Sequence, residues 1–176
     1  FSVQFALDPK TNPRGGPMGP GPLPVAARAA AKSWGPDWVT DRGTQAAMRD
    51  QTQAILARDG ITIESMAISA GRVHLRIRNT RLDNAPQAIG RTARALAVTM
   101  PASVSSFEIV AMAQGVPLSN VVIRRADLEA LEFAPGQDIA MEQRVQILPV
   151  AFALPEGALR SDGLYPRFKW GLAPYV

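Results

Sequence analysis

Residues 72–94 read RVHLRIRNTRLDNAPQAIGRTAR, and we expect this stretch to decide the fold. Its first part alternates polar and aliphatic residues with a period of two, the pattern of a strand that has one buried face. Its second part predicts a helix with Asn84 as N-cap, Gln87 three residues later and Pro86 tolerated in the first turn. A strand therefore leads directly into a helix in the middle of the chain.

The sequence on either side of this stretch predicts two hairpins and two more helices. Helical spacing of apolar residues covers 44–59, and Gly60 suits the left-handed end of that helix. A further short helix is expected at 127–132. Strands are expected at 61–69, 72–79, 104–113 and 118–124, with tight turns at 70–71 and 114–115.

These elements favour a two-layer fold. Two helices on one face of a four-stranded antiparallel sheet would bury the apolar sides of both layers. We therefore expect an α+β two-layer sandwich in the order αββαββα. Residues 145–154 could add a fifth strand, which Pro149 would confine to an edge or a bulge.

Gly90 lies in the middle of the second helix, where glycine costs about 1 kcal/mol relative to alanine. Close packing of this helix against a strand is the expected reason for a glycine there. Close approach of a ligand is the alternative.

The chain divides into four parts by composition. Residues 44–134 hold the α/β domain, and residues 135–176 form a C-terminal extension. Residues 1–8 alternate like the last strand of a preceding domain. Residues 9–43 form a linker rich in proline and glycine that ends in aromatic anchors, Trp34 and Trp38. No apolar run approaches the roughly 18–20 residues of a membrane-spanning helix.

Arginine dominates the charge. The protein has a formal net charge of +4, whereas residues 72–94 alone hold six arginines and one acid. The rest of the chain is therefore close to neutral. Arginine has a planar fork of donors that suits contacts with carboxylates and phosphates. A GC-rich genome is an equally good explanation for the preference for arginine over lysine.

The candidate binding residues lie on the predicted strand and helix of 72–94. The strand would present one basic face made of Arg72, His74, Arg76 and Arg78, and the helix would extend it with Arg91 and Arg94. Such a surface could bind the carboxylates or phosphates of a polymer. The alternative is an ordinary solvated face whose charges are balanced by Glu64 and Glu108 on adjacent strands.

The chain offers little for catalysis. It has no cysteine and one histidine, and it lacks the motifs of zinc proteases, serine hydrolases and nucleotide-binding proteins. We therefore expect a protein that is not an enzyme and that uses no cofactor or metal ion. Nucleic acid is not an expected partner, because no aromatic residue lies between Arg72 and Arg78 to stack on bases.

Three segments of the chain resemble one known family. They are PQAIGRTARALAV at 86–98, GVPLSNVVIRRADLEAL at 115–131 and YPRFKWGLAPYV at 165–176. In this order they are similar to the YjbH family (GfcD-like) of exopolysaccharide and capsule biosynthesis proteins of the bacterial outer membrane. The resemblance implies an α/β domain that faces the periplasm between two β-barrels of the same chain. It implies no catalytic residue.

We expect, from the residues and the resemblance together, a non-enzymatic domain that acts in exopolysaccharide secretion. Its partners would be an acidic exopolysaccharide, other export proteins and the flanking β-barrels, and its basic face would act through attraction that salt weakens. The alternative is a structural spacer or protein-docking module between the barrels, with no ligand of its own. A glycan-modifying enzyme would need two carboxylates that converge in a cleft, and the sequence shows no such pair.

Overall fold

A helix joins the two central strands of a mixed sheet. The computed structural model describes residues 21–25, 36–69, 71–132, 135–162 and 164. The helices are the 3-10 helix η2 (Pro36–Val39), α1 (Arg42–Ala57), α2 (Ala85–Thr99), α3 (Arg125–Leu131) and α4 (Gln137–Glu142). The strands are β1 (Ile61–Ile68), β2 (Arg72–Asn79), β3 (Ser106–Ala113), β4 (Val116–Arg124), β5 (Gln146–Leu148) and β6 (Leu159–Arg160).

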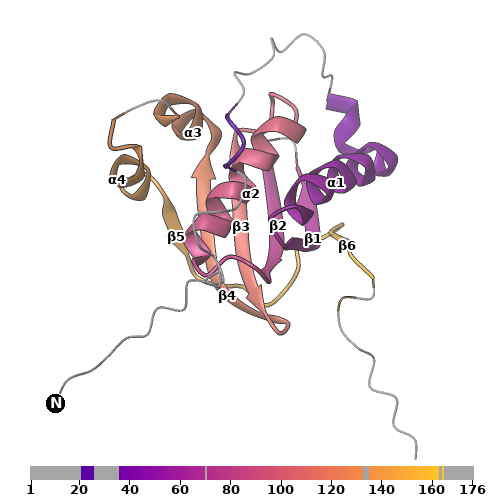
Figure 1. Ribbon diagram of the computed structural model, residues 1–176. Coiled ribbons are helices and arrows are strands. Elements are labelled where there is room, and N and C mark those ends of the chain that lie inside the picture. Colours follow the sequence, from indigo (N-terminus) through magenta and orange to yellow (C-terminus); the bar gives the residue numbers. More distant parts are fainter. Residues whose placement is uncertain (1–20, 26–35, 70, 133–134, 163, 165–176) are drawn as a thin grey trace, which may run out of the picture.

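The six strands form one sheet in the order β5-β4-β3-β2-β1-β6. The helices α1 and α2 lie side by side on one face of this sheet (Figure 1). Neighbouring strands are antiparallel except β2 and β3, which run parallel with Arg72 opposite Ser106 and Arg78 opposite Met112. The architecture is α+β with helices on one face, as predicted. The sheet is mixed, whereas an antiparallel sheet was predicted.

The prediction of a four-stranded, or at most five-stranded, antiparallel sheet in the order αββαββα is therefore wrong. The chain leaves β2 at one end of the sheet, α2 carries it back, and β3 starts where β2 began. A crossover of this kind joins parallel neighbours, whereas a tight turn joins antiparallel ones. Both predicted hairpins are present, but α2 connects them through a parallel pair. The helix α4 and the strands β5 and β6 follow α3.

The individual elements lie close to where the sequence predicts them. The turn between β3 and β4 has positive φ angles at Gln114 (49°) and Gly115 (82°), as a type I′ hairpin turn requires. The strand β5 lies at the edge of the sheet and ends just before Pro149, as expected for a proline that cannot donate to a ladder.

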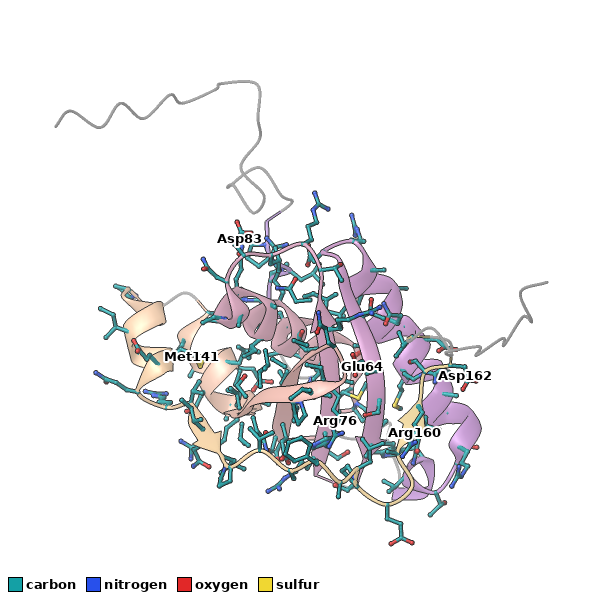
Figure 2. All side chains as sticks on the ribbon, turned by 90° about the horizontal axis from the view of Figure 1, so that it is seen from below. Glu64, Arg76, Asp83, Met141, Arg160 and Asp162 are labelled. Carbon is teal, nitrogen blue, oxygen red and sulfur yellow. The ribbon has the colours of Figure 1, made fainter. Side chains whose placement is uncertain are left out.

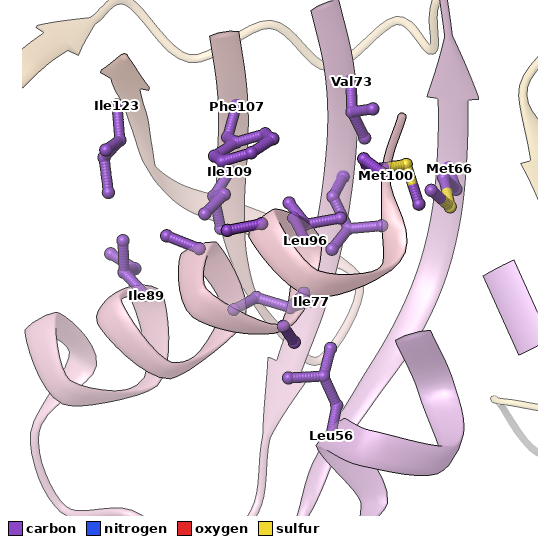
Figure 3. Packing of buried hydrophobic residues seen from close by; sticks show 14 of the residues in the cluster. Leu56, Met66, Val73, Ile77, Ile89, Leu96, Met100, Phe107, Ile109 and Ile123 are labelled. Carbon is purple, nitrogen blue, oxygen red and sulfur yellow. The ribbon is translucent and has the colours of Figure 1, made fainter. Parts of the chain in front are cut away.

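The core lies between the sheet and the helices α1 and α2. Figure 3 shows Ile89 of α2 pointing toward Ile123 of β4, and Leu96 of α2 pointing toward the strands β2 and β3. Each fully buried aliphatic or aromatic side chain contributes about 1.5–3 kcal/mol relative to its exposed state. The largest fully buried side chains are Phe107, Leu56, Ile61, Ile63, Met66, Leu75, Ile77, Leu96, Ile109, Val73, Val104 and Val110.

A buried arginine closes the C-terminal end of α2. The last turn of α2 holds no basic residue, but Arg125, at the start of α3, is 4% exposed and reaches this end. Its Nη2 donates to the carbonyl oxygen of Ala97 (2.7 Å), and its Nη1 donates to those of Met100 (3.2 Å), Pro101 (2.7 Å) and Val104 (3.4 Å). A cation at this position satisfies carbonyl groups that the helix leaves free and matches its dipole.

The outer edge of β1 is covered by a side chain of α1 and by the residue that follows β6. Gln53 of α1 donates from Nε2 to the carbonyl oxygen of Ile61 (3.2 Å) and accepts from the amide of Ile63 (2.6 Å). Ser161 donates from its amide to the carbonyl oxygen of Glu64 (2.9 Å) and from Oγ to that of Ile63 (2.7 Å). These contacts occupy groups that would otherwise be free to pair with another chain.

A strap, residues 149–158, joins β5 to β6. Because these two strands are the opposite edges of the sheet, the strap has to cross its whole width. It crosses on the face away from α1 and α2. Figure 2 shows this segment running from one edge of the sheet to the other. The residues predicted as a C-terminal extension thus supply both edge strands and a cover for part of the second face.

Several sequence predictions fall on residues that are not described: the strand at 1–8, the linker at 9–20 and 26–35, which includes Trp34, and the motif at 165–176. Trp38, the other predicted anchor, is buried in the core. The first described part of the predicted linker, residues 21–25, ends at Val25, whose amide donates to Glu132 Oε1 (3.1 Å). None of the described helices combines the length and apolar character that a membrane span demands.

Two glycines differ in what surrounds them. A Cβ atom added at Gly90 would meet no described atom within 4 Å, so the close packing expected there is wrong. Gly60 has a φ of 71°, and a Cβ atom there would lie 2.5 Å from Cβ of Arg81. The first glycine is therefore not needed for packing against the described residues, whereas the second is needed for both conformation and space.

We predict opposite effects of alanine at these two glycines. Gly90→Ala should raise the free energy of unfolding by about 0.5–1 kcal/mol, because alanine loses less backbone entropy in a helix. Gly60→Ala should lower it by at least about 1–2 kcal/mol, because the left-handed conformation is strained for alanine. Urea unfolding of both variants measures the difference. A Gly90→Ala variant as unstable as Gly60→Ala would contradict this account.

Candidate functional site

Arg76 fixes the strap to the sheet. It lies on β2, is 7% exposed, and points to the face opposite the helices because its neighbours Leu75 and Ile77 enter the core. Its Nη2 donates to three consecutive strap carbonyl oxygens, those of Ala151 (2.8 Å), Phe152 (3.0 Å) and Ala153 (2.8 Å). Because Nη2 carries two N–H groups, the three carbonyl oxygens share them, and a hydrogen bond from a charged donor contributes about 1.5–3 kcal/mol. This side chain is thus the principal link between the strap and the sheet.

The charges around Arg76 follow from a bulge in β1. The β1–β2 register shifts between Ile63 and Ser65, so Glu64 is the extra residue and is 9% exposed. Burial lowers the pKa of Arg76 from its ordinary value, and the carboxylate of Glu64 opposes this shift. The nearby Arg160 adds to the lowering of the Arg76 pKa through repulsion. A carboxylate and two guanidinium groups therefore share one region of the strap face.

A cavity of about 860 Å³ lies between the strap and the strands β1 and β2. We name it the larger strap cavity. Figure 2 shows Glu64, Arg76, Arg160 and Asp162 around this part of the sheet. Its wall is formed by Glu64, Ser65, Arg76, Phe152, Ala153, Leu154, Arg160, Ser161, Asp162 and Leu164.

A smaller strap cavity of about 440 Å³ lies beside Arg72, His74 and Glu108. The Nη1 atom of Arg72 is 3.6 Å from Glu108 Oε2, and Asn120 donates from Nδ2 to Glu108 Oε1 (2.9 Å). Burial lowers the pKa of His74; Glu108 opposes this effect, and Arg76 adds to it. His74 is therefore held in its neutral form by its surroundings.

The structure divides the predicted site residues into two groups. Arg72, His74, Arg76 and Arg78 share the strap face of β2, where Arg78 donates from Nη1 to the carbonyl oxygen of Leu164 (3.4 Å). Arg91 and Arg94 lie on the helix side, where Arg91 pairs with Asp59 and Arg94 pairs with Glu132. The sheet separates the two groups, so they do not form one continuous basic surface.

A family comparison matches this chain over its whole length. The model of the YjbH family, described as "Exopolysaccharide biosynthesis protein YbjH", covers residues 1–176. The chain belongs to the YjbH family. The resemblance drawn from its three motifs is confirmed, and membership indicates a role in exopolysaccharide biosynthesis or export, as an envelope-associated protein. No curated protein and no solved structure matches the chain.

Several residues of the larger strap cavity in this YjbH-family domain were not predicted from the sequence. Ser65 follows the bulge in β1, and Phe152 lies on the strap. Arg160 and Asp162 come after the strap in the sequence. The bulge leaves no clear mark in a sequence that alternates on both sides of it. The prolines at 149 and 155 are the available signal that residues 149–158 run as an irregular cover and not as a strand.

The opposite face of the same YjbH-family domain carries an apolar groove of about 660 Å³. It lies between α2, α3, α4 and the strands β4 and β5, and Gly90 forms part of its wall. Ile147 beside it is 79% exposed. Among the described residues that line it, the charged ones are Arg94, Glu132 and Glu142, of which the first two form an ion pair.

Among the residues that the structure describes, no group of three or more His, Asp and Glu side chains is placed to hold a metal ion. We therefore consider the hydrogen-bond donors and acceptors that line the two strap cavities. These are guanidinium groups, carboxylates, three serine hydroxyl groups and one imidazole.

We predict that His74 makes the fold less stable in mild acid. Its folded-state pKa lies below the ordinary value of 6.5, so the unfolded chain takes up a proton first as the pH falls. The free energy of unfolding should therefore fall between about pH 7 and about pH 5. His74→Gln should lessen this fall.

Urea unfolding of both proteins at about pH 7.5 and about pH 5 measures the effect, because the penalty disappears above the unfolded-state pKa. An equal loss of stability in the two proteins on acidification would show that His74 is not held neutral.

Proposed function

We propose that this domain is a non-enzymatic, periplasmic part of an outer-membrane protein of exopolysaccharide secretion, flanked by β-barrels of its own chain. Its strap face contacts an acidic glycan. Membership of the YjbH family supports the exopolysaccharide role. The observation that carries the proposed contact is that each strap cavity has an exposed arginine in its wall, Arg72 at the smaller one and Arg160 at the larger one.

Electrostatics supports this contact. The side chain of Arg72 is 58% exposed and only loosely paired with Glu108, and Arg160 is exposed beside the buried Arg76. Guanidinium groups bind carboxylates with two parallel hydrogen bonds when the geometry allows it. Uronic acid residues, which recur along acidic polysaccharides, would therefore find donors at both cavities.

The state of the remaining polar groups supports a binding role without catalysis. Glu108 already interacts with Asn120 and Arg72, and burial, together with Arg76, lowers the pKa of the half-buried His74. A general acid or base needs a pKa near the working pH and a free path to its substrate. These two groups serve the packing of the strap face instead.

The test is the binding of polygalacturonate, an acidic polysaccharide, to the 176-residue chain. Raising the salt concentration from about 50 mM to about 300 mM should weaken binding several-fold, because screening shortens the reach of the charges. The double variant Arg72→Gln/Arg160→Gln should lower the affinity by at least about tenfold, as expected when charged hydrogen bonds are lost.

The matched control is Arg42→Gln/Arg58→Gln, which removes the same charge from exposed positions at the two ends of α1. It should bind as the unchanged protein does. Binding that ignores both salt and the Arg72/Arg160 substitutions, or absence of binding at low salt, would contradict the proposed contact.

The second candidate function is a structural spacer or protein-docking module with no ligand of its own. The apolar groove beside α2 favours it, because Gly90 and the exposed Ile147 leave an apolar surface uncovered by the described residues. In the full-length protein, this function predicts exopolysaccharide secretion that the Arg72 and Arg160 substitutions leave unchanged.

A further inference from the structure

Two polar atoms in the wall of the larger strap cavity have no hydrogen-bond partner among the described residues. They are Oγ of Ser65 and Nε of Arg76. The residue Ser65 is 2% exposed, and the residue Arg76 is 7% exposed. Leaving a buried polar group unsatisfied costs about 1–3 kcal/mol. Because nearly all such groups are paired in folded proteins, these two require a partner, and the adjoining cavity is where it can enter.

The charges of the cavity point to a ligand rich in hydroxyl groups. Arg76 and Arg160 only donate hydrogen bonds, Glu64 and Asp162 as carboxylates only accept them, and the Ser65 hydroxyl does both. The two positive and two negative groups balance, so the wall does not favour a compact anion such as phosphate. A ligand whose groups each donate and accept can satisfy both kinds of side chain at once.

Phe152 adds an aromatic surface to the same cavity. Its carbonyl oxygen is held by Arg76, yet the residue is 73% exposed. The position of this ring is thus tied to the sheet through its backbone, while much of its surface faces solvent. The negative face of an aromatic ring attracts C–H groups, which a pyranose ring presents on its less polar side.

We propose that the larger strap cavity binds one pyranose residue of a polysaccharide, with its hydroxyl groups bonded to Ser65 and Arg76 and its ring against Phe152. This inference rests on the proposed function and gives it a defined site. The volume of about 860 Å³ lies within the roughly 300–1,000 Å³ of small-ligand sites. The rim carboxylate of Asp162 and the guanidinium group of Arg160 complete the hydrogen bonding.

The experiment measures binding of two hexasaccharides, hexagalacturonate and maltohexaose, to the 176-residue chain in about 0.5 M NaCl, where attraction to the exposed Arg72 is screened. At least one hexasaccharide should bind. Ser65→Ala and Phe152→Ala should each weaken this binding about five- to tenfold, which corresponds to the loss of one hydrogen bond or one ring contact. The matched controls, Ser103→Ala and Ile139→Ala, alter exposed residues away from the cavity and should leave binding unchanged.

Thermal unfolding separates a binding role of Ser65 from a structural one. Removing an unsatisfied hydroxyl group should leave the Tm of Ser65→Ala unchanged or raise it by about 2–4 °C, although binding falls. A Ser65→Ala variant that loses stability and binding together would overturn the assignment. Failure of both hexasaccharides to bind would overturn it as well, and a raised Tm without binding would show that Ser65 meets water only.

The outcomes distinguish this site from the proposed function. Salt-sensitive polygalacturonate binding that needs Arg72 and Arg160, without hexasaccharide binding at high salt, leaves the function standing and overturns the site. Hexasaccharide binding that needs Ser65 and Phe152, without any effect of the arginine substitutions on polymer binding, supports the site and overturns the proposed electrostatic contact.

Discussion

The contact between Arg76 and the strap carbonyl groups is the interaction on which the second face of this domain depends. One guanidinium group on a central strand binds the carbonyl oxygens of three consecutive residues, Ala151, Phe152 and Ala153. The strap runs between β5 and β6, so holding its middle also helps to position both edge strands. Both strap cavities are lined by Ala153 and Leu154, next to the segment of the strap that Arg76 binds.

Arg125 shows the same physical solution on the other side of the molecule. It donates to four carbonyl groups at and beyond the end of α2, as Arg76 does to three in the strap. The strap crosses the sheet as an irregular segment, and the chain also becomes irregular where it leaves the end of α2. In both places the carbonyl groups would otherwise lack hydrogen-bond partners. Arginine suits this task because it keeps its charge and offers several donors in a fixed fork. Part of the abundance of arginine in this chain thus has a structural purpose.

The two faces of the sheet have different chemical characters. The strap face is polar and holds the cavities with guanidinium groups and carboxylates, whereas the helix face carries the apolar groove beside Gly90. The proposed glycan contact and the alternative docking role therefore concern opposite sides of one domain. Membership of the YjbH family is compatible with both, since export of a polysaccharide involves the polymer and proteins that handle it.

Local patterns in the sequence predicted most elements, because each depends on neighbours within one strand or helix. The alternation at 72–78 placed four side chains on one face, and the turn at Gln114 and Gly115 has the expected φ angles. The parallel pairing of β2 with β3 was missed because an antiparallel sheet was assumed where a helix joins the two hairpins. The strap was missed because its contacts join residues about 75 positions apart, such as Arg76 and Ala151. The bulge at Glu64 and the open space at Gly90 likewise depend on tertiary packing.

The most direct test of the central claim is amide hydrogen exchange in Arg76→Gln compared with the unchanged protein. The amide of Ser161, which donates to the carbonyl oxygen of Glu64, reports on the docking of the strap end, and the amides of β3 report on the core. If Arg76 holds the strap, exchange at Ser161 and in β6 should accelerate by about tenfold or more while β3 keeps its protection. Unchanged protection at Ser161 and β6 would contradict the account.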